Sequence, residues 1–135
     1  MGFQNIEKKN FWYILLRDII ASKWLNYVFY RSVSVNYTER IPEKGPLIFT
    51  PNHQNALIDA MAPLCNIDKQ LVFLARSDIF KKKWVASILY FLKILPIFGI
   101  RDGYGELKKN EAIFSKTIDV LNSGSGLVLF PEGNH

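Results

Sequence analysis

Residues 47–75 read LIFTPNHQNALIDAMAPLCNIDKQLVFLA, and this stretch determines the fold class. Its two ends, residues 47–50 and 71–75, are short, continuous apolar runs, which are typical of strands buried on both faces. Between them, residues 56–65 predict a short helix, which Pro63 interrupts. The stretch therefore predicts a strand, a helix and a second strand, which is the repeating unit of a parallel sheet.

The same alternation continues toward the C-terminus. A helix is expected over residues 84–95, where Pro96 ends it, and amphipathic spacing predicts another over residues 107–121. Apolar runs at residues 97–100 and 127–130 predict two more strands. We therefore expect an α/β fold with a mainly parallel sheet covered by helices.

The length of 135 residues suffices for one such domain, which we assign to residues 31–135. Its first residues, 31–37, have period-two apolar spacing and predict an edge strand. A Pro-Glu-Gly turn signal directly follows the last predicted strand, where a covering helix is still needed. We therefore expect the domain to be incomplete at its C-terminus.

Charge and cysteine content narrow the classes of partner. Lys and Arg number 17 against 12 Asp and Glu, and the net charge of +5 suits a phosphate substrate, an acidic membrane or nucleic acid. The basic residues are scattered and no nucleic-acid-binding motif is present, so no nucleic-acid partner is expected. Cys65, the single cysteine, excludes an internal disulfide and is interpreted as a small core residue.

Residues 11–30 form an aromatic segment with helical spacing, which we assign with residues 1–10 to an N-terminal amphipathic helix. No signal-peptide cleavage site follows it, and its charged residues argue against a membrane-spanning helix. Two interpretations remain open: the helix lies in a membrane interface, which we favour, or it packs on the domain core. One side carries Asp18, Ser22 and Asn26, and the other carries Trp12, Leu16, Ile19, Ile20, Trp24 and Tyr27.

Polar segments follow the predicted strands. Because ligands of parallel sheets bind beyond the carboxyl ends of the strands, these segments are expected to converge on one edge. They are Thr50-Pro51-Asn52-His53-Gln54-Asn55, Arg76-Ser77-Asp78, Arg101-Asp102-Gly103 and Pro131-Glu132-Gly133.

His53 and Asp59 are the candidate catalytic pair. They are six positions apart, so they meet only if His53 lies in the loop and Asp59 in the first turns of the following helix. A carboxylate that holds one imidazole nitrogen makes the other a better base, and the same pair also fits a purely structural hydrogen bond. No Gly-x-Ser-x-Gly nucleophile elbow is present, so such a base would activate a hydroxyl of the substrate.

Other readings of these side chains stay open. Arg101 suits either a bidentate phosphate clamp or an ion pair with Asp102 or Glu106. Phe-Pro-Glu-Gly at residues 130–133 is also a common strand-ending turn. A metal site made of His53, Asp59, Glu132 and His135 is conceivable from residue types, although no known ligand spacing supports it.

Taken together, three ordered blocks resemble the glycerolipid acyltransferase family, which includes 1-acyl-sn-glycerol-3-phosphate and glycerol-3-phosphate acyltransferases. The blocks are Asn52-His53 through Asp59, the apolar run that ends in Arg101, and Phe130-Pro131-Glu132-Gly133. The resemblance covers about residues 31–135.

Two departures from the family pattern bear on the identity of the acceptor. Five residues separate His53 from Asp59 where the family commonly has four, and Asn134-His135 stand where the third block often continues Thr-Arg-Ser.

The resemblance implies roles and partners. His53 is the expected general base and Asp59 its orienting partner, while Arg101, Glu132, Gly133, Arg76 and Asn52 are expected to bind the substrate. It implies transfer of a fatty acyl group from a thioester of coenzyme A or acyl carrier protein to a hydroxyl of lysophosphatidate or glycerol 3-phosphate. No cofactor or metal is expected, and the expected partner is an anionic membrane, bound peripherally on its cytoplasmic face. The alternatives are a non-catalytic membrane-binding fragment of such an enzyme and a metal-dependent phosphoesterase.

Overall fold

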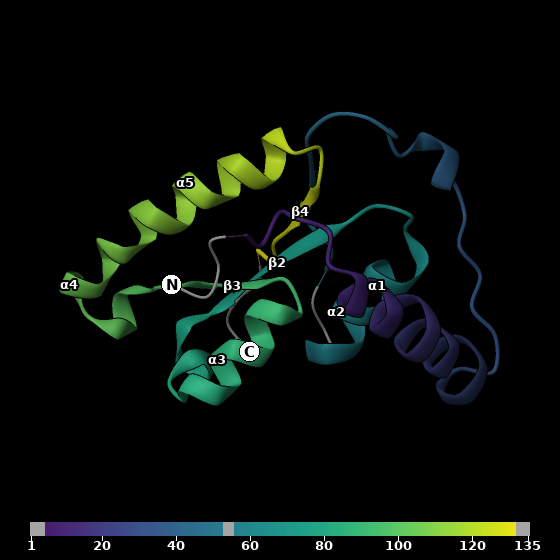
Figure 1. Cartoon of the computed structure of the whole chain (residues 1–135), viewed down its shortest axis with the longest axis horizontal. Helices are drawn as coiled ribbons and strands as arrows, with labels where there is room; N and C mark the ends of the chain where they lie inside the picture. Colours follow the sequence, from purple (N-terminus) through teal and green to yellow (C-terminus); the bar gives the residue numbers. More distant parts are fainter. Residues whose placement is uncertain (1–4, 53–55, 132–135) are drawn as a thin grey trace.

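The computed structural model describes residues 5–52 and 56–131, and a parallel sheet lies at the centre of that part of the chain (Figure 1). The four strands that it describes follow the order β1-β4-β2-β3, and every neighbouring pair is parallel. The predicted α/β class with a parallel sheet is confirmed. The strands are β1 (Leu47–Phe49), β2 (Leu71–Arg76), β3 (Ile94–Ile97) and β4 (Gly126–Val128).

Helices connect successive strands and cover both faces of the sheet. In Figure 1, α5 runs above the sheet, while α2 and α3 lie below it. This arrangement is expected of right-handed crossovers, because the chain moves one way along the sheet up to β3 and then returns to β4. The helices are α2 (Ala56–Asn66), α3 (Lys83–Phe91), α4 (Tyr104–Leu107) and α5 (Lys109–Asn122).

The core follows from the alternation of side chains along β2. Val72 points to the α5 side, where it packs with Ile113 and Val120. Leu71 and Phe73 point to the other side, where partly buried side chains of α2 pack against them. Full burial of such a side chain stabilises the fold by about 1.5–3 kcal/mol, so both faces of the central strand contribute.

The boundary between α3 and β3 differs from the prediction. The helix ends at Phe91, and Lys93 takes a left-handed conformation with φ 64°, so the chain turns directly into β3. Pro96, expected to end a helix, lies inside β3 opposite Ala75. Proline is tolerated there because β3 is an edge strand of the described sheet and its outer side carries no ladder hydrogen bonds. The strand predicted at residues 97–100 therefore shares only its first residue with β3.

The edge strand predicted at residues 31–37 is wrong. This segment runs along the outer side of the molecule, away from the sheet (Figure 1), and is followed by a short 3-10 helix, η3 (Thr38–Arg40). Val33 and Val35 are both exposed. Period-two spacing produces a strand only where a neighbour exchanges hydrogen bonds with it, and β1 pairs with β4 alone among the described strands.

The N-terminal helix (residues 11–29) consists of α1 (Phe11–Leu15), η1 (Leu16–Ala21) and η2 (Trp24–Phe29), wound mostly as π-helix. Its polar side faces the domain: Ser22 Oγ donates to the Cys65 carbonyl at 3.2 Å, and Asn26 Nδ2 donates to Asn66 Oδ1 at 3.1 Å. None of the helices in the described part of the chain has both the length and the apolar character needed to cross a membrane.

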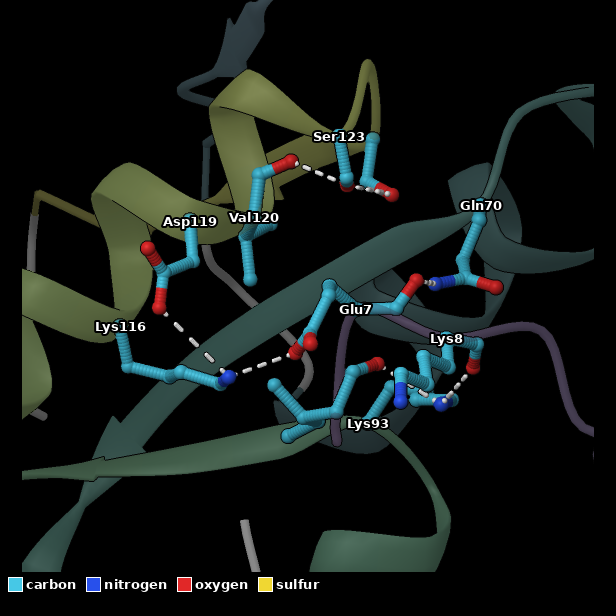
Figure 2. Close-up of polar contacts among 10 residues, drawn as sticks. Glu7, Lys8, Gln70, Lys93, Lys116, Asp119, Val120 and Ser123 are labelled. Carbon is cyan, nitrogen blue, oxygen red and sulfur yellow. Dashed lines mark hydrogen bonds and ion pairs between the residues drawn. The ribbon is translucent and has the colours of Figure 1, made fainter. Parts of the chain in front are cut away.

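The segment ahead of this helix is held beside the amino ends of β2 and β3, as Figure 2 shows. Lys93 Nζ donates to the carbonyls of Ile6 at 2.7 Å and Lys8 at 2.6 Å, and Gln70 Nε2 donates to the carbonyl of Glu7 at 2.7 Å. Glu7 also pairs with Lys116 of α5 at 2.7 Å. These contacts anchor the start of the N-terminal helix to the domain.

Candidate active site

The carboxyl ends of the four strands lie at one edge of the sheet, as the sequence predicted. Phe49 of β1 and Phe73 of β2 both align with Val128 of β4, and Arg76 aligns with Ile97 of β3. Because all the strands are parallel, the segments that follow them leave the sheet on the same side. This edge is where chemistry is expected in such a fold.

The first predicted block lies where β1 passes into α2. Asn52 is exposed in the segment after β1, and Asp59 is on the first turn of α2, half-buried. A carboxylate is stabilised at a helix N-terminus by the helix dipole. Asp59 thus occupies the place that the pairing with a preceding histidine requires. His53 itself lies outside the described residues, so the distance between the two side chains is not defined.

Two arginines stand at the carboxyl edge. Arg76 ends β2, and its guanidinium donates to Asp78 Oδ2 at 2.7 Å while more than half of the side chain stays exposed. Arg101 lies on the 3-10 helix η5 (Ile100–Asp102) that follows β3, and it too is exposed. The prediction that Arg101 directly follows a strand is therefore corrected, because a short coil and the start of η5 separate it from Ile97.

The ion pairs that were considered for Arg101 are not formed. Asp102 accepts a hydrogen bond from the Gly99 amide at 2.8 Å, and Glu106 pairs with Lys109. Within residues 5–52 and 56–131, Arg101 has no ion-pair partner. Its five N–H donors are therefore available to an anion from solution.

Asp102 has a lowered pKa at this edge, first because of the hydrogen bond from the Gly99 amide. The hydrogen bond from the Gly99 amide, another from the Ser77 side chain, and the charges of Lys81 and Arg76 together hold the pKa of Asp102 below its usual value. Ser77 opens the 3-10 helix η4 (Ser77–Phe80) after β2 and is buried. Sequence reasoning missed that Asp102 closes the turn of Arg101 through the Gly99 amide, because so short a turn has no clear sequence signal.

The third block is only partly described. Phe130 packs against the cluster around Phe73 and Val128, and Pro131 is exposed. Glu132 and Gly133, both expected to bind the acceptor, lie outside the described residues, as does His135 of the alternative metal site. Among the residues that are described, no group of three or more side chains of the kinds that ligate metals is gathered.

A concavity of the described residues lies away from this edge. It has a volume of about 330 Å³ and is found between the N-terminal helix and the C-terminal end of α2, lined by Arg17, Asp18, Leu64, Cys65, Asn66, Ile67 and Asp68. Asp59 is on the first turn of the same helix, so this concavity is at the opposite end of α2 from the candidate site. Burial raises the pKa of the Cys65 thiol, which favours the unreactive neutral form there.

Comparison with known proteins adds one finding. The model of a family described as acyltransferase matches residues 32–135. Comparisons with curated proteins and with solved structures found no match. The matched region includes all three blocks and every strand of the described sheet. Because the match spans well over half of the chain, the protein belongs to the acyltransferase family.

Proposed function

We propose that this acyltransferase moves a fatty acyl group from a thioester to a hydroxyl of lysophosphatidate or glycerol 3-phosphate, as in phospholipid biosynthesis. The observation that carries the proposal is the pair of guanidinium groups at the carboxyl edge of the sheet. Arg76 and Arg101 follow adjacent strands and are both exposed. Guanidinium groups match a phosphate in charge and in hydrogen-bond geometry, so this edge suits an acceptor that carries one.

His53 would act as the general base in this reaction. It takes the proton from the acceptor hydroxyl while the oxygen attacks the thioester carbonyl, and collapse of the tetrahedral intermediate releases the thiolate, which recovers a proton. Asp59 would hold the imidazole in the tautomer that accepts this proton. Support comes from the resemblance of the first block and from the position of Asp59 at the start of α2.

The remaining predicted residues would complete the acceptor site. Asn52 follows β1, and Glu132 and Gly133 follow β4, the strand that lies between β1 and β2. Their chain positions would bring them to the same edge as Arg76. Two substrates then meet there: the phosphorylated acceptor and a thioester of coenzyme A or acyl carrier protein as co-substrate. No cofactor or metal is needed for this chemistry.

A membrane surface would deliver the lipid substrates. The N-terminal helix buries Tyr13 and Leu25 and turns Ser22 and Asn26 to α2, while its other large apolar side chains stay in solvent. An apolar side rich in Trp and Tyr suits a membrane interface. The exposed set is Phe11, Trp12, Ile19, Ile20, Trp24, Tyr27, Val28 and Phe29.

Helix α3 packs against the N-terminal helix and carries exposed apolar side chains of its own. Tyr13 of the N-terminal helix and Phe91 of α3 meet edge to face, with ring centroids 6.4 Å apart. Trp84 and Ile88 are exposed on α3, and the run Lys81-Lys82-Lys83 at its start is exposed as well. Lysines beside an apolar surface favour anionic lipid. We therefore place the protein peripherally on the cytoplasmic face of a membrane.

The test is an acyl-transfer assay with paired acceptors. The purified chain is supplied with acyl-coenzyme A or acyl carrier protein thioester, and with either glycerol 3-phosphate or lysophosphatidate, each beside its unphosphorylated counterpart. We expect thiol release and ester formation with a phosphorylated acceptor, unchanged by a chelator. Transfer to the unphosphorylated acceptors at the same rate, or phosphate release in place of ester formation, contradicts the proposal.

A further inference from the structure

The turn that carries Arg101 is closed by its neighbour Asp102. Asp102 Oδ2 accepts from the Gly99 amide at 2.8 Å, and the Asp102 amide donates to the Gly99 carbonyl at 3.0 Å. The two residues thus exchange two hydrogen bonds across η5, with Arg101 inside the closed turn. This exchange fixes the backbone on both sides of Arg101.

The same carboxylate reaches a second loop. The side chain of Ser77, the first residue after β2 and only 8% exposed, lies close enough to this carboxylate to help lower the pKa of Asp102. Since β2 and β3 are neighbours with Arg76 opposite Ile97, the turn of Arg101 lies beside the segment that leaves β2.

The turn is held by backbone and side-chain bonds together. Glycines stand at both ends of the turn, and Gly103 has φ 102°, a conformation that other residues rarely adopt. The Gly103 amide donates to the Ile100 carbonyl at 3.1 Å, and the Asp102 carboxylate adds a side-chain bond across the turn.

We propose that Asp102 is a positioning residue, which holds the turn of Arg101 so that the guanidinium meets the phosphate of the acceptor. The inference rests on the proposed function, because it assigns Asp102 to the acceptor side of that site. Asp102 carries a negative charge beside an anion site, so it acts through Arg101 and does not contact the phosphate. Losing the restraint leaves Arg101 present but free to sample other positions, which weakens acceptor binding.

Three variants and one control test the role. Asp102→Ala removes the side-chain bond to the Gly99 amide, Asp102→Asn keeps one acceptor oxygen, and Ser77→Ala removes only the hydroxyl beside the carboxylate. Glu111→Ala, exposed on α5, is the control. Acceptor affinity is measured by calorimetry with glycerol 3-phosphate and by KM, beside KM for the thioester. We expect Asp102→Ala to raise the acceptor Kd and KM by roughly three- to tenfold. For Asp102→Asn and Ser77→Ala, the acceptor Kd and KM should lie between those of Asp102→Ala and wild type. KM for the thioester should not change in any variant, and Glu111→Ala should behave as wild type does.

The double variant Arg101→Lys/Asp102→Ala is decisive. If Asp102 acts through Arg101, the double variant binds the acceptor no more weakly than Arg101→Lys alone. Additive losses, a rise in thioester KM, or wild-type acceptor affinity in a folded Asp102→Asn protein each overturn the inference. The proposed function is contradicted by a different result, namely that the wild-type protein neither binds nor acylates a phosphorylated acceptor.

Discussion

Tyr13 is a buried tyrosine whose hydroxyl has no hydrogen-bond partner among the described residues. Burial raises its pKa from 10.0 to about 12; Arg17 opposes the shift, and Asp18 and Cys65 add to it. Because the pKa is higher in the folded state, the protonated phenol contributes stability below pH 10.0, and this is lost as pH rises toward about 12.

We expect Tyr13→Phe to match or exceed wild-type stability at pH 7, since it removes an unsatisfied buried hydroxyl. At pH 11 the free energy of unfolding of the variant should rise by about 1 kcal/mol relative to that of wild type, because the unfolded variant has no phenol to ionise. Urea unfolding of both proteins at the two pH values measures this difference. If the stability difference between Tyr13→Phe and wild type is the same at pH 7 and at pH 11, the raised pKa of Tyr13 is contradicted.

Arg101 is the residue on which acceptor recognition is expected to depend. Lysine keeps the charge but lacks the planar fork, so Arg101→Lys should lose about 1.5–3 kcal/mol of a charge-assisted contact. We expect KM for the phosphorylated acceptor to rise roughly tenfold or more, with little change for the thioester. Two saturation curves decide the matter. If only KM for the thioester rises, Arg101 belongs to the donor site. If neither KM changes, Arg76 is the remaining described candidate for binding the acceptor phosphate.

At the scale of elements, the proposed membrane binding depends on the exposed apolar side chains of the N-terminal helix. Trp12 and Tyr27 are 67% and 82% exposed. Replacing both with serine should weaken binding to anionic vesicles by roughly tenfold or more, since each large apolar side chain is worth about 1.5–3 kcal/mol when buried. Phe114→Ser, on the exposed side of α5, is the matched control and should bind as wild type does.

Lysines on α3 should contribute to the same binding. Each cation near an anionic surface is worth about 1 kcal/mol, so Lys82→Ser/Lys83→Ser should weaken vesicle binding by roughly tenfold or more at low salt. The loss should shrink at high salt, where wild-type binding weakens too. Sedimentation with neutral and anionic vesicles provides the readout. Equal recovery of wild type in the supernatant with and without vesicles contradicts both predictions at this scale.

Element boundaries show where sequence patterns lose information. Leu92 and Leu95 have the spacing of a helix face, yet Leu95 lies fully buried in β3. The sequence pattern placed Leu95 in the helix expected over residues 84–95, which is the wrong element, because short apolar runs fit both periods. The left-handed turn at Lys93 has no signal in the sequence, since that conformation is typical of glycine or asparagine.

On the scale of the whole molecule, the fold class was predictable and the strand order was not. Continuous apolar runs alternating with helices require a buried parallel sheet. That β4 inserts between β1 and β2 depends on packing between distant segments, which no local pattern encodes. The site divides in the same way: the positions of Asp59 and Arg101 beyond the strands were predicted from motifs, whereas Ser77 comes near Asp102 only when β2 and β3 pair.

One contact network links the N-terminal helix to the domain. Lys93 donates to two carbonyls of the segment ahead of that helix, within the network drawn in Figure 2. Lys93→Met keeps the Cβ and most of the buried chain but leaves both carbonyls without this donor. We expect a loss of about 1.5–3 kcal/mol in the free energy of unfolding. Lys44→Met, at an exposed position, should be neutral in the same urea titration, and equal stability of the two variants would show that the network does not hold the segment.

The central claim is that a histidine base transfers an acyl group to a phosphorylated acceptor, and the turnover of His53→Ala tests it most directly. Acyl transfer is measured at saturating thioester and acceptor, with circular dichroism as the check on folding. We predict that kcat falls by about 10²–10⁴, since the proton of the acceptor hydroxyl loses its base. Wild-type turnover by a folded His53→Ala protein would contradict the account.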